Sequence, residues 1–337
     1  MPADVLVCLR EKARQTCPRV VLPEAEDEIV LAAAREVFEA EVAVPVLVGN
    51  PQRVVEVGRR GGIELEGMDL IDTGDEEVRE RLLADCLKRF PAMSPSRAER
   101  RLRSPLVVAS LLVALGEGQA MVAGRSNPTQ EVIFASRLFH ELREGASLLS
   151  SMFLMRVPGF AGPEGEYIIF ADCGVVVAPD APGLAEIALA TARTARELLG
   201  WEPRVALLSF STKASGYDAS VARIREALRL LREREPALAV DGELQLDAAI
   251  VPEVAARKTE GESPVAGRAN VLIFPDLNAG NIAYKCVQRF ARAEAYGPLL
   301  QGLAATVSDL SRGSSVSDVV GTITMVAAAC ALTGGSR

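Results

Sequence analysis

Short apolar segments alternate with longer amphipathic ones along almost the whole chain, and this alternation limits the fold more than any other feature. A strand-like run at 19–23 precedes a helical pattern at 29–40, and a run at 42–49 precedes a helical pattern at 51–60. Apolar runs separated by about 10–20 helical residues predict βαβ units, whose parallel strands are buried on both faces. We therefore expect an α/β protein with mostly parallel sheets.

The same pattern continues to the end of the chain. Further strands are predicted at 119–124, 148–157, 167–172, 204–209, 247–251 and 270–275, and further helices at 76–90, 96–115, 129–144, 181–199, 220–233, 282–293 and 316–329. A domain usually has about 150 residues, so 337 residues predict two domains. A hydrophobic content of 49% is sufficient for two cores.

The chain has one histidine, His140, and this excludes several kinds of site. A zinc centre with several histidines is impossible, and a Ser-His-Asp triad would depend on His140 alone. The six cysteines show no CxxC pairing, which is typical of reduced thiols rather than of a disulfide framework. We expect no bound metal, and acid–base chemistry falls mainly to carboxylates, lysine, tyrosine or cysteine.

The net charge of −8 argues against a nucleic-acid partner, although it leaves room for a local cationic site. The first 19 residues lack the pattern of a signal peptide. The longest apolar stretches, at 106–115 and 319–332, are shorter than the roughly 20 residues of a membrane span. We expect a cytoplasmic protein without membrane contact.

Ligands of open α/β sheets bind beyond the carboxyl ends of the strands, so the loops at these ends are the places to search. The segment 209–216 contains Ser211, Thr212 and Lys213, which suit an anion or, equally, form a polar turn with a helix cap. After the strand at 270–275, Asp276 and Asn278 can cap a helix. Asn281 and Lys285 stand four residues apart on one helix face, which favours a ligand.

A third polar segment, at 309–318, contains Ser311 and Arg312 before Gly313, and Asp318 at the start of an apolar helix. A helix cap explains the serines and the acid, but it does not explain the arginine. An arginine beside a helix N-terminus attracts an anion such as phosphate, and a nearby carboxylate can act as a base. The segment Asp241–Gln245, taken alone, is interpreted as a turn.

Together these segments resemble the phosphate acetyltransferase (phosphotransacetylase) family over essentially the whole chain, most closely from about Ala171 onward. The resemblance implies two three-layer α/β/α domains with mostly parallel sheets, similar to isocitrate and isopropylmalate dehydrogenases, with the active cleft between them. It implies a discontinuous first domain, 1–145 plus 297–337, a second domain, 146–296, and a homodimer. The motifs that carry it are Val21–Glu24 with Asp27, Leu47–Asn50, Ser211–Lys213, Asp241–Gln245, Pro264–Gly267, Pro275–Asn278, Gly280-Asn281 with Tyr284-Lys285, Gln301–Leu303 and Asp309–Gly313.

The resemblance also implies a reaction, the reversible transfer of an acetyl group between coenzyme A (CoA) and inorganic phosphate. CoA is a substrate, and neither a tightly bound cofactor, a metal nor an acyl-enzyme is implied. Asp318 matches the base that deprotonates the CoA thiol, Ser311 the residue that steadies the thiolate or transition state, and Arg312 the arginine that binds phosphoryl or carbonyl oxygens. The expected substrate-binding residues are Ser211, Thr212, Lys213, Asn278, Asn281, Lys285, Arg125 and Arg137.

One region departs from the family pattern. Where the family often has Ser-Gly-Ala-x-His-Ser/Thr, residues 123–129 are Ala-Gly-Arg-Ser-Asn-Pro-Thr, and Phe134 stands at the position of a substrate-binding arginine. Arg137, one turn away, or Arg125 in the loop are candidates to compensate, and a second family arginine falls near Lys88 or Arg89. Two alternatives stay open: a butyryl or other short-chain acyltransferase, and a catalytically weak protein that binds CoA or acyl phosphate.

Overall fold

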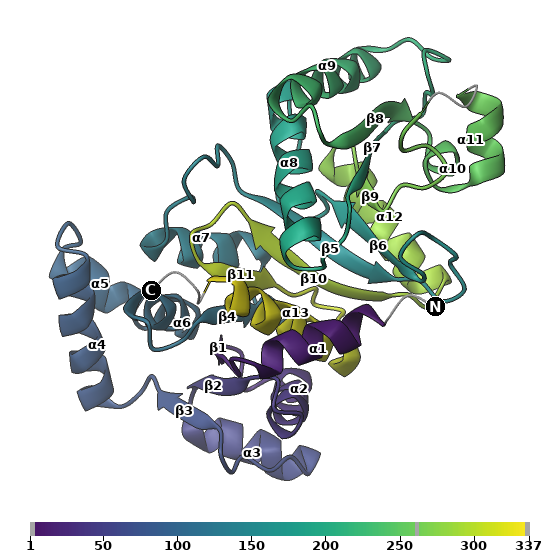
Figure 1. The fold of residues 1–337 in the computed structure, drawn as a ribbon. Coiled ribbons are helices and arrows are strands. Elements are labelled where there is room, and N and C mark those ends of the chain that lie inside the picture. The colour runs from purple at the N-terminus through teal and green to yellow at the C-terminus, as the bar shows by residue number, and fades with distance from the viewer. Residues whose placement is uncertain (1–3, 260–262, 334–337) are drawn as a thin grey trace. The chain divides into compact units, whose positions relative to one another are not determined.

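The computed structural model describes residues 4–259 and 263–333, and it shows a mixed α/β fold with mostly parallel strands (Figure 1). The chain divides into two compact units. The terminal unit comprises Leu6–Glu141 and the chain from Leu303 onward, and the central unit comprises Leu142–Gly302 with Asp4 and Val5. The α/β class predicted from the alternating pattern is confirmed, whereas the domain boundaries, the cleft and the likeness to isocitrate dehydrogenase stay predictions.

In the terminal unit five parallel strands follow the order β3-β2-β1-β4-β11. They are β1 (Arg19–Leu22), β2 (Val44–Gly49), β3 (Asp69–Asp72), β4 (Ala120–Ala123) and β11 (Thr306–Asp309). Helix α2 packs with α13, and α6 packs with α7. The helices are α1 (Val5–Arg14), α2 (Glu28–Glu39), α3 (Pro51–Gly61), α4 (Glu76–Arg89), α5 (Pro95–Arg101), α6 (Pro105–Leu115), α7 (Thr129–Phe139) and α13 (Val316–Thr333).

Local signals explain where these helices begin. Asp27, Asn50 and Asp75 cap α2, α3 and α4 with side-chain oxygens that accept backbone N–H bonds. The single helix predicted at 96–115 is wrong, because α5 ends at Arg101 and α6 begins at Pro105. Proline has no N–H to continue a helix but suits its first turn, so the position of Pro105 accounts for the break.

In the central unit six strands follow the order β10-β5-β6-β9-β7-β8. Strand β5 is antiparallel to both its neighbours, and β6, β9, β7 and β8 are parallel. The strands are β5 (Ser150–Arg156), β6 (Tyr167–Ala171), β7 (Arg204–Leu208), β8 (Ala239–Leu244), β9 (Val271–Ile273) and β10 (Glu294–Gln301). The helices are α8 (Ala181–Glu197), α9 (Ala219–Arg234), α10 (Leu246–Ile250), α11 (Pro252–Lys258) and α12 (Leu277–Phe290).

Two further expectations from the sequence are wrong. The segment 247–251 forms helix α10 rather than a strand, and the strand lies just before it, as β8, which includes the presumed turn from Asp241. The helix predicted at 129–144 ends at Phe139, and His140 has extended backbone angles. Among the helices of the described residues, none has both the length and the apolar character that crossing a membrane requires.

Candidate functional site

The carboxyl ends of three neighbouring strands in the terminal unit bring polar loops together. Strand β1 pairs with β4 and β4 with β11, and Asp309, the last residue of β11, lies opposite Ala123. The segments that follow these strands therefore leave the same edge of the sheet, where ligands of parallel sheets bind. They contain Glu24, the loop from Gly124 to Pro128, and the loop that leads to α13.

Glu24 organises the loop after β4. Its carboxylate is buried and accepts backbone N–H bonds from Gly124 (3.0 Å), Arg125 (2.8 Å), Ser126 (2.8 Å) and Asn127 (2.9 Å). The Asn127 amide donates a fifth bond at 2.7 Å. A carboxylate with this many donors fixes the loop backbone, so the segment that departs from the family pattern is firmly held here.

Asp309 has a buried carboxyl group and lies two residues before Ser311. Its Oδ2 accepts a 2.5 Å hydrogen bond from the Thr129 hydroxyl, while its buried Oδ1 has no hydrogen-bond partner within the described part of the chain. Burial raises the pKa of Asp309 to about 7, although the Thr129 bond lowers it, and the charge of Glu24 raises it further. Gly124 makes this packing possible, because a Cβ there would lie 2.0 Å from Oδ1.

Arg125 contacts the backbone of Arg312 rather than pointing freely to solvent. Its Nη1 donates to the Arg312 carbonyl oxygen, and its Nε lies 3.5 Å from the Asp27 carboxylate. The Arg312 side chain itself is exposed. The structure therefore brings two of the predicted arginines together, with Arg125 supporting the loop that presents Arg312.

Asp318 is buried in the first turn of α13. Its Oδ2 accepts 2.9 Å bonds from the backbone N–H and the hydroxyl of Ser315, and its own N–H donates to Ser315 Oγ at 3.2 Å. This reciprocal pattern is a capping box, so the helix-cap interpretation holds for Asp318. Ser311, seven residues before Asp318, is half-buried, and its Oγ accepts a long bond of 3.4 Å from the Gly313 N–H.

Phe134 and Arg137 lie on the exposed side of α7, three residues apart. Phe134 is 41% exposed, and the Arg101 guanidinium carbon lies 4.5 Å from the centroid of its ring. Arg101 was not among the residues expected from the sequence, because only the fold places α5 against this ring.

In the central unit the loop after β7 is tied to β8 by its own side chains. The Lys213 ammonium lies 2.6 Å from the fully buried Asp241 carboxylate. Ser211 Oγ donates to Glu243 at 3.0 Å, and Thr212 Oγ1 donates to the Gln245 side-chain oxygen at 3.3 Å. All three predicted binding residues therefore have partners within the protein.

Glu243 is the main acceptor for this loop. It also accepts the Ala214 N–H at 2.7 Å and the Arg225 Nε at 2.8 Å. Burial by itself would raise the pKa of Glu243, but the bonds from Arg225, Ala214 and Ser211 outweigh burial and lower it. The segment from Asp241 to Leu244 is thus buried strand, and its two carboxylates hold the neighbouring loop.

Helix α12 carries the other predicted residues of the central unit. Asp276 caps it through a 2.9 Å bond from Ala279 N, and Asn278 is exposed in its first turn. Asn281 donates its amide to the Cys173 carbonyl oxygen at 3.0 Å. The exposed Lys285 lies four residues on, with its ammonium 4.7 Å from the Tyr284 ring centroid. Asn278 and Lys285 are therefore more exposed than Asn281.

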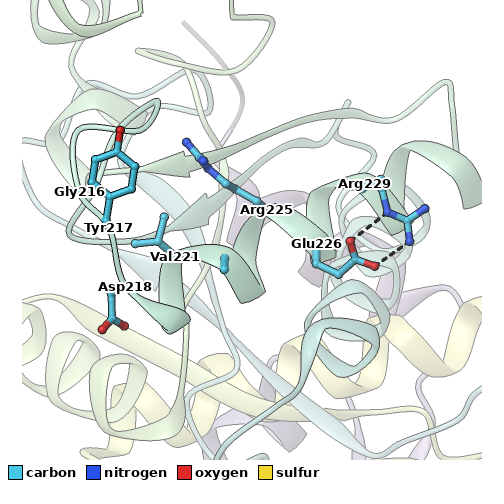
Figure 2. Close-up of a pocket in the computed structure, with 8 residues that line it drawn as sticks. Gly216, Tyr217, Asp218, Val221, Arg225, Glu226 and Arg229 are labelled. Carbon is cyan, nitrogen blue, oxygen red and sulfur yellow. Dashed lines mark hydrogen bonds and ion pairs between the residues drawn. The ribbon is translucent and has the colours of Figure 1, made fainter.

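One pocket lies beside the loop after β7, and a larger one lies away from the polar loops described above. A pocket of about 410 Å³ follows the loop after β7, and Figure 2 shows Tyr217 at one end and Glu226 paired with Arg229 at the other. A larger one, about 880 Å³, is lined by residues just before β4 and β11, such as Gln119 and Ala305. Because ligands favour the carboxyl ends of parallel strands, we do not assign the larger pocket to the predicted site.

The single histidine belongs to neither group of loops. His140 is buried, its Nε2 lies 3.1 Å from the Ser110 carbonyl oxygen, and burial lowers its pKa. No group of three or more histidine, cysteine, aspartate or glutamate side chains suited to a metal ion occurs in residues 4–259 and 263–333.

Comparison with known proteins identifies the family. Residues 5–327 match the family described as "Phosphate acetyl/butaryl transferase". The chain belongs to this family. It is 41% identical over 319 residues to the phosphate acetyltransferase of Acetivibrio thermocellus, covering 94% of this chain and 95% of that protein.

Two solved structures of this family have the same fold. A phosphotransacetylase from Streptococcus pyogenes matches with a TM-score of 0.85, and the EutD phosphotransacetylase from Staphylococcus aureus with 0.83. Each is 35% identical, and each match covers 97% of this chain and 98% of the other. The family predicted from the sequence motifs is confirmed.

Three functional features escaped the sequence analysis. Glu24 belongs to a family motif for which no role was predicted, yet its carboxylate holds the loop after β4. Asp309 opened a motif without a role of its own, and its buried, raised-pKa carboxyl group had no signal in the sequence. Asp241 was interpreted as part of a turn because Asp and Gly are rare inside strands.

Proposed function

We propose that the protein is a phosphate acetyltransferase, which reversibly converts acetyl-CoA and phosphate to acetyl phosphate and CoA. The observation that carries the proposal is the arrangement after β11. Ser311 and the exposed Arg312 lie in the loop before α13, whose first turn holds the buried Asp318. These side chains supply a base, a hydroxyl and a cation within eight residues, which is what acyl transfer to a thiol requires.

In the direction of acetyl-CoA synthesis, the Asp318 carboxylate takes the proton of the CoA thiol. The thiolate then attacks the carbonyl carbon of acetyl phosphate, and the new C–S bond forms as negative charge builds on the carbonyl oxygen. Arg312 stabilises this oxygen or the phosphoryl oxygens, and Ser311 donates a hydrogen bond to the developing charge. The C–O bond to phosphate breaks, and phosphate leaves.

Asp318 is buried, and a carboxylate must be placed accurately if it is to accept a proton from a thiol. An aspartate in water has a pKa near 3.9 and a thiol has one near 8.5, so transfer of the proton from the thiol to the carboxylate is unfavourable. The two Ser315 bonds hold the side chain of Asp318 in place for this transfer.

The remaining residues have less direct roles in this proposal. Arg125 positions the Arg312 backbone through its bond to the carbonyl oxygen. In the central unit we propose that Asn278 and Lys285 contact substrate, while Ser211, Thr212 and Lys213 shape their loop. CoA serves as a substrate without a tightly bound cofactor, and the homodimer and the cytoplasmic location also belong to the proposal.

The experiment is a measurement of CoA-dependent phosphate release from acetyl, propionyl and butyryl phosphate. We expect the highest kcat/KM with acetyl phosphate. A preference for butyryl phosphate would identify a butyryltransferase instead. Binding of CoA without turnover of any acyl phosphate would contradict an enzymatic function, and light scattering of the purified protein tests the dimer.

A further inference from the structure

A cationic segment without acidic partners runs from the end of α4 through α5. Residues 88–103 contain six lysines and arginines and a single acid, Glu99, in a chain whose net charge is −8. Many arginines elsewhere in the described residues pair with carboxylates, as Arg81 does with Glu117 at 2.6 Å. Within the residues that the structure describes, no ion pair forms at the six cations of this segment: Lys88, Arg89, Arg97, Arg100, Arg101 and Arg103.

Arg101 differs from the other five because its guanidinium packs on a ring from another helix and its Nε atom is buried, whereas Arg89 lies 5.8 Å from the ring of its neighbour Phe90. The guanidinium carbon lies 4.5 Å from the centroid of the Phe134 ring, and the Nε atom is buried without a hydrogen-bond partner in the described part of the chain. The ring face attracts the cation but offers no acceptor for its N–H groups. A buried donor without an acceptor is costly, so an anionic ligand would complete this site.

The exposed face of α7 adds a second cation. Arg137 lies three residues after Phe134 and is exposed, which places both side chains on one side of the helix. Glu131, the acid on the same side, forms an ion pair with neither arginine among the described residues. The helix begins at Thr129, whose hydroxyl bonds Asp309, so Phe134 stands about 7.5 Å along α7 from the candidate site.

We propose that Arg101, seated on Phe134, and Arg137 form a binding subsite for a phosphate group of the substrate. The planar guanidinium matches phosphate oxygens with paired donors, whereas an ammonium does not. The proposal rests on the proposed function for its choice of substrate. The phosphate belongs either to the acyl phosphate or inorganic phosphate, or to CoA, and the experiment separates these sources.

The test compares Arg101→Ala with the wild-type enzyme, using acetyl phosphate, CoA and 3′-dephospho-CoA. Loss of a charge-assisted contact is expected to raise one KM about tenfold with little change in kcat. A rise confined to acetyl phosphate assigns the site to the acyl phosphate, and a rise for CoA but not for dephospho-CoA assigns it to the 3′-phosphate. Arg100→Ala, an exposed arginine on the same helix, is the matched control and keeps wild-type values.

Unchanged KM values for all three substrates in Arg101→Ala would overturn the subsite. So would equal changes with every substrate together with a lower melting temperature, because these indicate a structural role only. If Arg101→Ala does not fold, Phe134→Leu removes the ring face and keeps an apolar contact, and it must raise the same KM. If the wild type has no transferase activity, inorganic phosphate binding by calorimetry, with weaker binding in Arg101→Ala expected, tests the subsite separately.

Discussion

Thr129 donates a 2.5 Å hydrogen bond to the buried carboxyl group of Asp309. This bond joins the first residue of α7 to the last residue of β11, which lies two residues before Ser311. The other carboxyl oxygen of Asp309 is buried without a partner in the described residues, and burial raises the pKa to about 7. The protonation state of Asp309 therefore changes near neutral pH, beside the proposed catalytic segment.

The first prediction concerns stability and pH. The pKa of Asp309 rises from 3.8 to about 7 on folding, so the folded state binds the proton more tightly. Protonation of this group favours folding between these values, and the contribution is lost as the pH rises through about 7. Asp309→Asn removes this dependence. Between pH 5 and pH 8 the wild type should lose about 2–4 kcal/mol of unfolding free energy that the variant does not lose.

Chemical denaturation at the two pH values measures this difference. Asp85→Asn is the control, because Asp85 is partly exposed on α4 and pairs with Arg81 at 3.6 Å. Its effect relative to wild type should be nearly the same at both pH values. An equal effect of Asp309→Asn at pH 5 and pH 8 would show that Asp309 does not titrate between them.

Asp318 is predicted to be the base. Asp318→Asn still has an oxygen to accept the Ser315 bonds, so the helix cap is largely kept. The variant loses the proton acceptor, and kcat should fall by about 10²-fold or more. Ser315→Ala is the matched control, because it removes the cap but keeps the carboxylate. It should cost about 1 kcal/mol of stability. We expect kcat to stay within a few fold, because the backbone N–H of residue 315 still holds the carboxylate.

Steady-state kinetics and thermal unfolding of both variants decide this point. A kcat near the wild-type value in Asp318→Asn would remove Asp318 as the base. A large loss of kcat in Ser315→Ala as well would mean that the position of the carboxylate, more than its basicity, limits the reaction.

Glu24 is predicted to be essential for the order of the loop after β4. Glutamine at this position has one acceptor oxygen where the carboxylate has two, and its amide would face backbone donors such as Ser126 N–H. Glu24→Gln should lower the free energy of unfolding by about 2–3 kcal/mol. Glu26→Gln provides the comparison, because Glu26 is partly exposed and its pair with Arg53 at 3.2 Å is worth little. Similar melting temperatures for the two variants would contradict this role.

Much of the fold followed from the sequence because apolar strands and capped helices have local signals. Strand β8 did not, since Asp241, Gly242 and Glu243 are residues of turns. They form a buried strand because Lys213 and Arg225, distant in the sequence, pair with the two carboxylates. Strand β10 contains Gly297-Pro298 and was missed for a similar reason.

The candidate site shows the same division between local and tertiary information. The motif around Ser311, Arg312 and Asp318 is local, so the sequence indicates it directly. The contact of Arg101 with Phe134 joins two helices that are separated by α6, and no local pattern predicts it. Likewise, only the parallel pairing of β1 with β4 places Glu24 beside the loop that it organises.

The last prediction separates binding from structure at Lys213. Its ammonium lies 2.6 Å from Asp241, which is fully buried, while the lysine side chain is 40% exposed. Removing the cation leaves Asp241 with Arg232 at 3.4 Å and the Ser263 hydroxyl. A buried charge that loses its nearest partner is costly, so Lys213→Met should lower the unfolding free energy by about 1–3 kcal/mol. We expect KM for CoA and acetyl phosphate to change less than threefold. Asp241→Asn in the same background should restore part of the stability, since the unpaired charge is gone. Unfolding and kinetic measurements on the single and double variants test this, and a stable Lys213→Met protein with a KM raised tenfold would identify Lys213 as a substrate-binding residue instead.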